Sequence, residues 1–365
     1  MLKIKEIIQH LESHAPLSTQ ESYDNSGLIC GDSNAVISGI LLALDCTEAI
    51  VNEAIEKKCN MIIAHHPIVF KGLKSFTGKN YVERTLIKAI KNDIAIYALH
   101  TNLDNYRFGV NYKIGTLLGL KNLRILEPKR DNQVKLVVFV PQAHAIAVRE
   151  AMCEAGAGKI GNYDSCSFST SGDGTFRALK GSNPFVGEAD QLHTENETRL
   201  ELICRNEQLS TVLSAMQTAH PYEEVACDII PLKNQDPYQG AGMIGELEKP
   251  LPAYEFLSLL KETFRCGIIK HTELCIEKIE RVAFCGGSGS FLLNKAKASN
   301  ADIFITGDYK YHDFFDAENR IIIADIGHYE SEQFTTELIA DLLKEKNTTF
   351  AVRFAETNTN PVKYF

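Results

Sequence analysis

Apolar residues follow two distinct patterns along this 365-residue chain. From residue 38 to 120, short continuous apolar runs alternate with segments in which apolar residues recur every three or four positions, and the same alternation returns from about 242 to 365. Continuous runs are typical of strands buried on both faces, and the three-to-four spacing is typical of amphipathic helices. The pattern therefore predicts an α/β domain with a mainly parallel sheet that helices cover on both faces.

The predicted elements can be given by range. The strands are 38–47, 60–67, 94–105 (its end already a loop), 281–287, 301–308, 320–328 and 348–354. The helices are 47–58, 81–93, 110–120, 256–264, 291–298 and 330–344. The two regions also have similar spacings between successive predicted strands: 20 residues separate Asp45 from His65, and 21 separate Cys285 from Thr306. This spacing indicates a weak internal repeat.

A different order of elements occupies the middle of the chain. A strand at 134–141, a helix at 143–156 and a segment with hairpin character around "SGDG" (171–174) come first. A strand at 199–205, a helix at 206–219 and a strand at 223–232 follow. The order β-α-β-β-α-β is that of a ferredoxin-like α+β domain. We therefore expect residues 126–238 to form an inserted domain, and 1–125 together with 239–365 to form the larger, interrupted one.

Composition and charge narrow the class of protein. The chain is 44% hydrophobic and 23% charged, which is ordinary for a globular protein, and it has no apolar run of 18 residues that would place it in a membrane. Its net charge of -9 and pI near 5.7 argue against a nucleic-acid partner, which would need a basic face.

The cysteines point to a reducing compartment. All ten are scattered singly, and none forms a C-x-x-C pair, so we expect reduced and mostly buried thiols. Residues 1–13 have the spacing of an amphipathic helix and lack the compact apolar core of a signal peptide. These observations predict a cytoplasmic protein.

Residue types that bind metals gather where the predicted strands end. Functional groups of parallel α/β sheets collect at these loops. The residues concerned are His65, His66, His100, Asp104, Asp308, His312, Asp325, His328 and Glu332. A lone histidine at a strand end is more often a surface or core residue, but this many candidates in neighbouring loops indicate a metal site.

Two of these histidines are adjacent in sequence. Neighbouring side chains of a strand point to opposite faces, so His65 and His66 are suited to two different ions of a closely spaced pair. Pro67 restricts His66 to extended conformations and so helps to hold this divergence. Mixed imidazole and carboxylate ligands suit zinc, iron, manganese or cobalt, and the sequence does not choose among them.

Several other features have two interpretations. The glycine-rich turn at 285–291 either holds a phosphate with its amides or is only a tight turn. Lys71, Lys74 and Lys79 either meet an anionic substrate or form a solvated surface. The segment 220–224, "HPYEE", is better explained as a turn that ends a helix than as a second metal site.

Nine segments, taken together, resemble a known family. They are "SHAPLSTQESYDNSGLICG", "AHHPIVFKGLKSFTG", "HTNLD", "GSGSF", "ITGDYKYHD" and "GHYESEQ", and in the middle region "GKIGNYDSCSF", "GTFRALKGSNPFVG" and "AHPYEE". The first six are similar to the Nif-three-like proteins, also called the GTP cyclohydrolase I type 2 homologue family. The last three are similar to the PII-like, CutA-type insert of the longer bacterial members. One departure is Tyr23, where the family usually has tryptophan.

The resemblance implies two divalent metal ions per subunit (zinc, iron or manganese) and a toroidal homohexamer. It assigns five ligands, which are His65, His66, Asp104, His328 and Glu332. Glu332 is our candidate for a carboxylate that bridges both ions, because its two oxygens can reach two ions. His100 and His312 are the candidate catalytic acids or bases, and Asp24, Asn25 and Asp45 are candidate hydrogen-bond partners of the site.

Two classes of function follow from the resemblance. The first is a metal-dependent hydrolase of the GTP cyclohydrolase type, with a nucleotide or another small molecule as substrate. The alternative is a metal-responsive regulatory or scaffold protein without catalysis, which the PII-like insert favours. The substrate itself is not encoded in any motif that the sequence displays.

Overall fold

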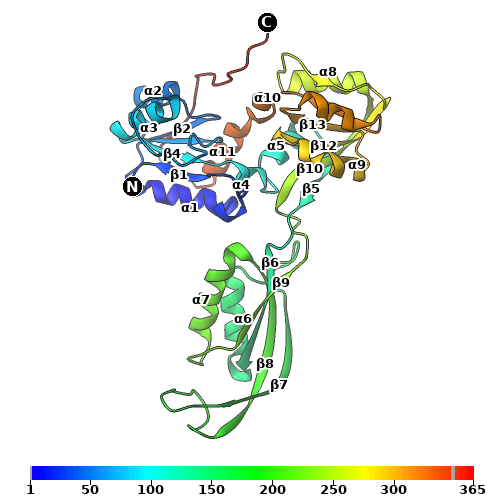
Figure 1. The fold of residues 1–365 in the computed structure, drawn as a ribbon. Coiled ribbons are helices and arrows are strands. Elements are labelled where there is room, and N and C mark those ends of the chain that lie inside the picture. The colour runs from blue at the N-terminus through cyan, green and yellow to red at the C-terminus, as the bar shows by residue number, and fades with distance from the viewer. Residues whose placement is uncertain (1, 347–349) are drawn as a thin grey trace. The chain divides into compact units, whose positions relative to one another are not determined.

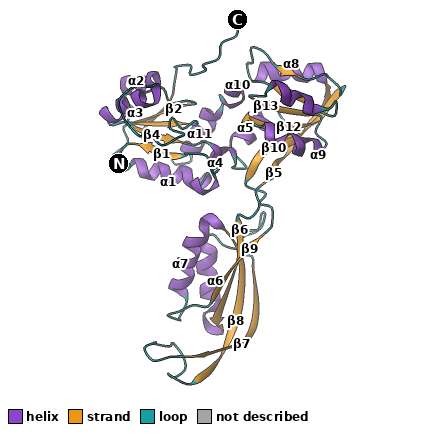
Figure 2. Cartoon of the chain, in the orientation of Figure 1, coloured by secondary structure: helices purple, strands orange, loops and turns teal. Residues whose placement is uncertain are grey.

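The computed structural model describes residues 2–346 and 350–365 (Figures 1 and 2). The chain forms two compact units. The larger contains Met1–Pro128 and Tyr238–Phe365, and the smaller contains Lys129–Pro237. Within the described ranges, no helix combines the length and apolar character that crossing a membrane requires.

The first sheet of the larger unit has the strand order β1-β4-β3-β2-β15. β15, β2, β3 and β4 are parallel, and β1 is antiparallel to β4. The bounds are β1 (Gly27–Cys30), β2 (Gly39–Ala43), β3 (Met61–Ala64), β4 (Ala95–Ala98) and β15 (Ala351–Phe354). Residues 348 and 349 of the predicted strand 348–354 lie outside the described residues. Its residues Ala351–Phe354 pair with β2, although the sequence pattern groups them with the second half of the chain.

The second sheet of the larger unit has the order β11-β14-β13-β12-β10-β5. Its central strands β12, β13 and β14 are parallel, and the other three pair antiparallel. The bounds are β5 (Lys121–Pro128), β10 (Gly240–Pro252), β11 (Lys270–His271), β12 (Lys278–Ser288), β13 (Ile303–Gly307) and β14 (Ile322–Asp325). The predicted α/β architecture is confirmed, and the structure adds that its strands are divided between two sheets.

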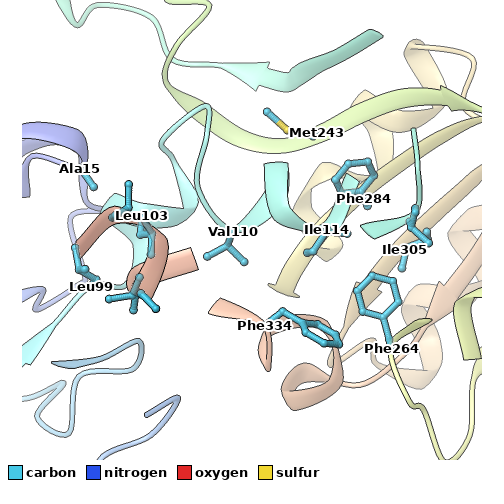
Figure 3. Packing of buried hydrophobic residues seen from close by; sticks show 14 of the residues in the cluster. Ala15, Leu99, Leu103, Val110, Ile114, Met243, Phe264, Phe284, Ile305 and Phe334 are labelled. Carbon is cyan, nitrogen blue, oxygen red and sulfur yellow. The ribbon is translucent and has the colours of Figure 1, made fainter. Parts of the chain in front are cut away.

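One apolar cluster joins the inner faces of the two sheets. Alternate strand residues point to opposite faces, so Ile40 and Ile63 enter this cluster while Leu41 and Ile62 enter a second cluster with the helices α2 (Glu48–Glu56) and α3 (Tyr81–Lys91). Figure 3 shows residues of both sequence halves in the shared cluster, Phe284 among them. The helices of this unit are α1 (Ile4–His14), α2 (Glu48–Glu56), α3 (Tyr81–Lys91), α4 (Thr101–Asp104), α5 (Val110–Leu117), α8 (Ala253–Thr263), α9 (Leu293–Ala298), α10 (His328–Glu332) and α11 (Thr335–Lys344).

The smaller unit is a four-stranded antiparallel sheet with two helices. Its strand order, β7-β8-β6-β9, and its chain order are those of a ferredoxin-like fold. The elements are β6 (Gln133–Pro141), α6 (Ala145–Glu154), β7 (Ser167–Arg177), β8 (Leu192–Arg205), α7 (Leu209–Ala219) and β9 (Cys227–Leu232). Apolar residues of both helices and of β6 and β8 form its core.

The hairpin turn predicted at "SGDG" (171–174) is wrong. These residues lie inside the single long strand β7, and each of them pairs with a residue of β8, as Gly172 does with Glu197. Glycine is acceptable in this strand because a side chain at Gly174 would collide with the carboxylate of Glu197. Close approach to the neighbouring strand explains the glycine better than a turn does.

Candidate metal centre

The carboxyl ends of the two parallel strand sets supply the candidate ligands. His65 and His66 follow β3 directly, and Asp104 ends the short helix α4, which begins just after β4. On the side of the second sheet, α10 follows β14 and carries His328 and Glu332 at its two ends, one helical turn apart. The structure brings these five residues together, although more than 200 residues separate the two groups.

The two carboxylate oxygens of Glu332 face two different groups of atoms. Oε2 lies 3.0 Å from His66 Nε2 and 3.1 Å from His328 Nε2, and these two nitrogens are 3.2 Å apart. Oε1 lies 3.7 Å from His65 Nε2, which is 3.6 Å from Asp104 Oδ1. Glu332 therefore sits between two ligand sets, as the bridging interpretation requires.

Each of the three histidines is held by its other ring nitrogen. His65 Nδ1 lies 2.7 Å from the Leu99 carbonyl oxygen, His66 Nδ1 lies 2.7 Å from Asp45 Oδ1, and His328 Nδ1 lies 2.7 Å from Asp308 Oδ2. Carbonyl and carboxylate oxygens only accept, so Nδ1 carries the hydrogen in each ring. This bond orients the ring and leaves Nε2 for a metal, as in the carboxylate–histidine–metal arrangement.

The close packing of these histidines and carboxylates shifts their pKa values. Burial lowers the pKa of His65, which therefore stays neutral. Burial also opposes the protonation of His66 and His328, but their carboxylate partners outweigh it and raise the pKa of His66 to about 9 and that of His328 to about 11. Burial and the charge of Glu332 raise the pKa of Asp104. The carboxylates of the cluster therefore favour positive charge beside them, and a bound cation would supply that charge.

The residues fit a metal ion in three respects. In the described part of the chain, His65 Nε2 and Asp104 Oδ1 are buried without a hydrogen-bond partner, a costly state that a shared ion would relieve. His65, His66 and Glu332 form a group whose ligand atoms lie within 4.8 Å of one another, with His65 and Glu332 buried and His66 half-buried. Tetrahedral coordination at about 2.0–2.1 Å places ligand atoms roughly 3.4 Å apart, close to the 3.0–3.7 Å observed.

The two predicted catalytic histidines differ in their placement. His100 follows β4, and its ring centroid lies 5.4 Å from that of His65 and 5.5 Å from that of His66. Its Nδ1 lies 2.7 Å from Asp24 Oδ1, so its Nε2 is available for proton transfer. His312 is exposed in the 3₁₀ segment Tyr311–Ala317 and packs on Tyr311. The contacts described for His312 do not reach the cluster, so its catalytic role stays a prediction.

Of the features with two interpretations, the structure favours the structural one for the glycine-rich turn and for the segment 220–224. In the glycine-rich turn, the amides of Gly286, Gly287 and Gly289 donate to the side chains of Asn111, Ser331 and Thr306, so they are already paired. Lys71, Lys74 and Lys79 are exposed, which both interpretations of these lysines allow. His220 ends α7, with Nε2 bonded to the Phe139 carbonyl and Nδ1 accepting from the Tyr222 amide. A metal at 220–224 is therefore not supported.

Three contributors to the site have roles that the sequence did not predict. Asp308, which the sequence offered only among the possible metal ligands, orients His328 instead. Thr359 donates its hydroxyl to Asp45 Oδ2 at 2.7 Å, and 314 positions separate the two residues. Gly287 has a φ of +60° and lies where a side chain would collide with Glu332. Gly287 stands in the glycine-rich turn noted above, but no local pattern predicts its approach to Glu332 or the role of Thr359.

Fold and site together define a mixed α/β protein with a histidine–carboxylate cluster at its strand ends that is a candidate metal site. Residues 2–361 match the model of the Duf34/NIF3 (NGG1p interacting factor 3) family, and the chain belongs to that family. The predicted resemblance is thereby confirmed.

Relatives of similar length support this assignment. A protein of Halalkalibacterium halodurans named GTP cyclohydrolase 1 type 2 homolog is 38% identical over 98% of both chains. One of the same name from Staphylococcus epidermidis is 35% identical over the whole of both. Among solved structures, a Bacillus cereus protein related to NIF3 has a TM-score of 0.86 at 36% identity, covering 100% of this chain and 99% of that one.

Proposed function

We propose that this protein binds two divalent metal ions per chain and uses them to hydrolyse a small molecule. His65, Asp104 and Glu332 would hold one ion, and His66, His328 and Glu332 the other. The observation that supports this most directly is the division of the Glu332 oxygens between the two ligand sets. Such ions supply Lewis acidity and lower the pKa of water.

His100 is the residue that we propose to move a proton. Burial raises the pKa of Asp24, but hydrogen bonds from His100 and Thr101 outweigh it and keep that pKa well below its usual range. Asp24 therefore stays ionised and holds the hydrogen on His100 Nδ1. The His100 Nε2 atom is left to accept and return a proton beside the metal ligands. The name of the relatives makes GTP the first substrate to test.

The test combines metal content with turnover. We expect protein from metal-replete medium to contain about two first-row transition ions per chain by elemental analysis. With GTP, and then with other nucleotides, the loaded protein should release a hydrolysed product that mass spectrometry identifies. His100→Ala should keep both ions and lose about 100-fold or more in rate, whereas His271→Ala, an exposed histidine on β11, should match the wild type.

Two outcomes would contradict parts of this proposal. Metal-free protein that takes up no ion on titration would rule out the metal centre. A fully loaded protein that turns over none of the substrates would favour the regulatory or scaffold alternative. The homohexamer stays a prediction, which light scattering on the full chain can check.

A separate prediction concerns Thr359. Thr359→Val should remove the hydroxyl that donates to Asp45 Oδ2, and Asp45 in turn orients His66. We expect metal affinity to fall by up to about tenfold, the lower end of the effect of losing a ligand's own hydrogen-bond partner. Thr359→Ser is the matched control, because it keeps the hydroxyl. Titration against a chromophoric chelator measures both, and equal losses in both variants would show that packing, not the hydrogen bond, matters.

A further inference from the structure

A second group of metal-binding side chains lies on the larger unit, outside the centre at the strand ends. It joins α1 to the end of α11 and consists of His10, His14 and Glu345. One ring nitrogen of each histidine and one carboxylate oxygen all lie within 4.8 Å of one another. The two groups have no residue in common.

The two histidines of this group are placed by the helix that carries them. His10 and His14 are four residues apart in α1, so both project from one face, and their ring centroids are 5.1 Å apart. Ile7 and Leu11 of the same helix are fully buried in the shared core, which holds α1 in place. The histidine pair is therefore mounted on a rigid element rather than on a loop.

The third donor comes from the far end of the sequence. Glu345 follows the last residue of α11 directly, and its Oε2 lies 3.5 Å from His14 Nε2. This separation matches the roughly 3.4 Å expected between two ligands of a tetrahedral zinc ion. Glu345 is exposed, so its carboxylate can adjust to an ion.

His10 has the hydrogen bond that ligating histidines usually make. Its Nε2 lies 2.8 Å from the Leu342 carbonyl oxygen in the last turn of α11, a group that has no partner within the helix ladder. Because a carbonyl only accepts, Nε2 carries the hydrogen and the Nδ1 lone pair is left for a cation. A ring held to a backbone carbonyl in this way is typical of metal ligands.

We propose that His10, His14 and Glu345 bind a third divalent ion, with zinc as the preferred metal. Two imidazoles and one carboxylate are a zinc donor set that leaves the fourth position to water or to another ligand. The ion ties the first helix of the chain to its last helix. Because the site requires both helices in their folded positions, the metal stabilises the folded state by mass action.

Zinc titration of the full chain tests this proposal. We expect wild-type protein to bind one more zinc ion per chain than the double variant His10→Ala/His14→Ala, measured by competition with a chromophoric chelator. His271→Ala, the exposed histidine on β11, should match the wild type. In cobalt-loaded protein, the visible absorption of one tetrahedral ion should be missing from the double variant.

Glu345→Gln is a milder change than the double variant, so it tests the site even if the double variant folds poorly. Glu345→Gln leaves the bond between His10 and Leu342 in place and should lower the affinity for the third ion about tenfold or more. Zinc should also raise the thermal midpoint of the wild type more than that of either variant. Equal zinc stoichiometry in wild type and double variant would overturn the site, and unchanged affinity in Glu345→Gln would overturn the three-donor set. Failure of the strand-end centre would be visible separately, because the double variant retains all five of its residues.

Discussion

Glutamine in place of Glu332 is expected to weaken both ions of the strand-end centre together. The substitution keeps the size of the side chain but removes the negative charge and one acceptor oxygen. Since Oε1 faces His65 and Oε2 faces His66 and His328, one ligand set loses its oxygen and the other keeps only a neutral amide oxygen, so both sets lose the negative charge of the carboxylate. We expect each affinity to fall by more than the ~10–100-fold that follows the loss of a ligand's hydrogen-bond partner.

Single histidine variants provide the contrast. His65→Ala and His66→Ala should each release one ion first, because the two rings belong to opposite sides of Glu332. His100→Ala should retain both ions. Anomalous diffraction from crystals of the four variants gives the occupancies directly. Full occupancy of both positions in Glu332→Gln would exclude a bridging role, and loss of metal in His100→Ala would make that residue a ligand.

Alanine in place of Gly287 is expected to damage both stability and metal binding. The φ of Gly287 is +60°, a left-handed conformation that costs an alanine about 1–2 kcal/mol. The new methyl group would also collide with Glu332 Oε1 and lie 3.2 Å from His328 Cε1. Glu332 is only 3% exposed and cannot easily move aside, so overpacking adds about 1–3 kcal/mol.

Gly119→Ala is the matched control for this prediction. Gly119 has a φ of +68°, and a methyl group there would meet nothing within 4 Å. Gly119→Ala should therefore lower the free energy of unfolding only by the cost of the left-handed conformation. Its metal affinity should stay unchanged. Denaturant unfolding and chelator titration of both variants separate the two effects. Equal metal affinities in the two variants would show that the Gly287 position does not constrain Glu332.

The candidate metal-binding residues could be recognised as a group because they lie at strand ends, whereas the choice of five of them as ligands came from the resemblance to the family. Continuous apolar runs such as 61–64 mark buried parallel strands, and parallel strands expose their carboxyl ends along one edge. His65 and His66 directly follow such a run, and the His328–Glu332 spacing places both on one side of a short helix. Patterns within a few residues were sufficient for these placements.

Pairing between distant segments could not be predicted in the same way. The pattern of 348–354 identifies a strand but does not say which strand is its neighbour, and β15 pairs with β2 rather than with a strand of the second half. The glycines at 171–174 resemble a turn until the partner β8 is known. Thr359 has no local motif, because its role depends on Asp45, which is 314 positions away.

The long separation between the ligands also sets the order of events during synthesis. Glu332 is made 266 positions after His66, which corresponds to about 13 to 53 s at ~5–20 residues per second. The whole of Lys129–Pro237, a unit with its own apolar core, is made within that interval. The inserted unit can therefore fold while the larger one is still incomplete. An ion that Glu332 helps to hold could enter only after nearly the whole chain has been translated, so metal loading at the proposed centre would be a late step in the maturation of this protein.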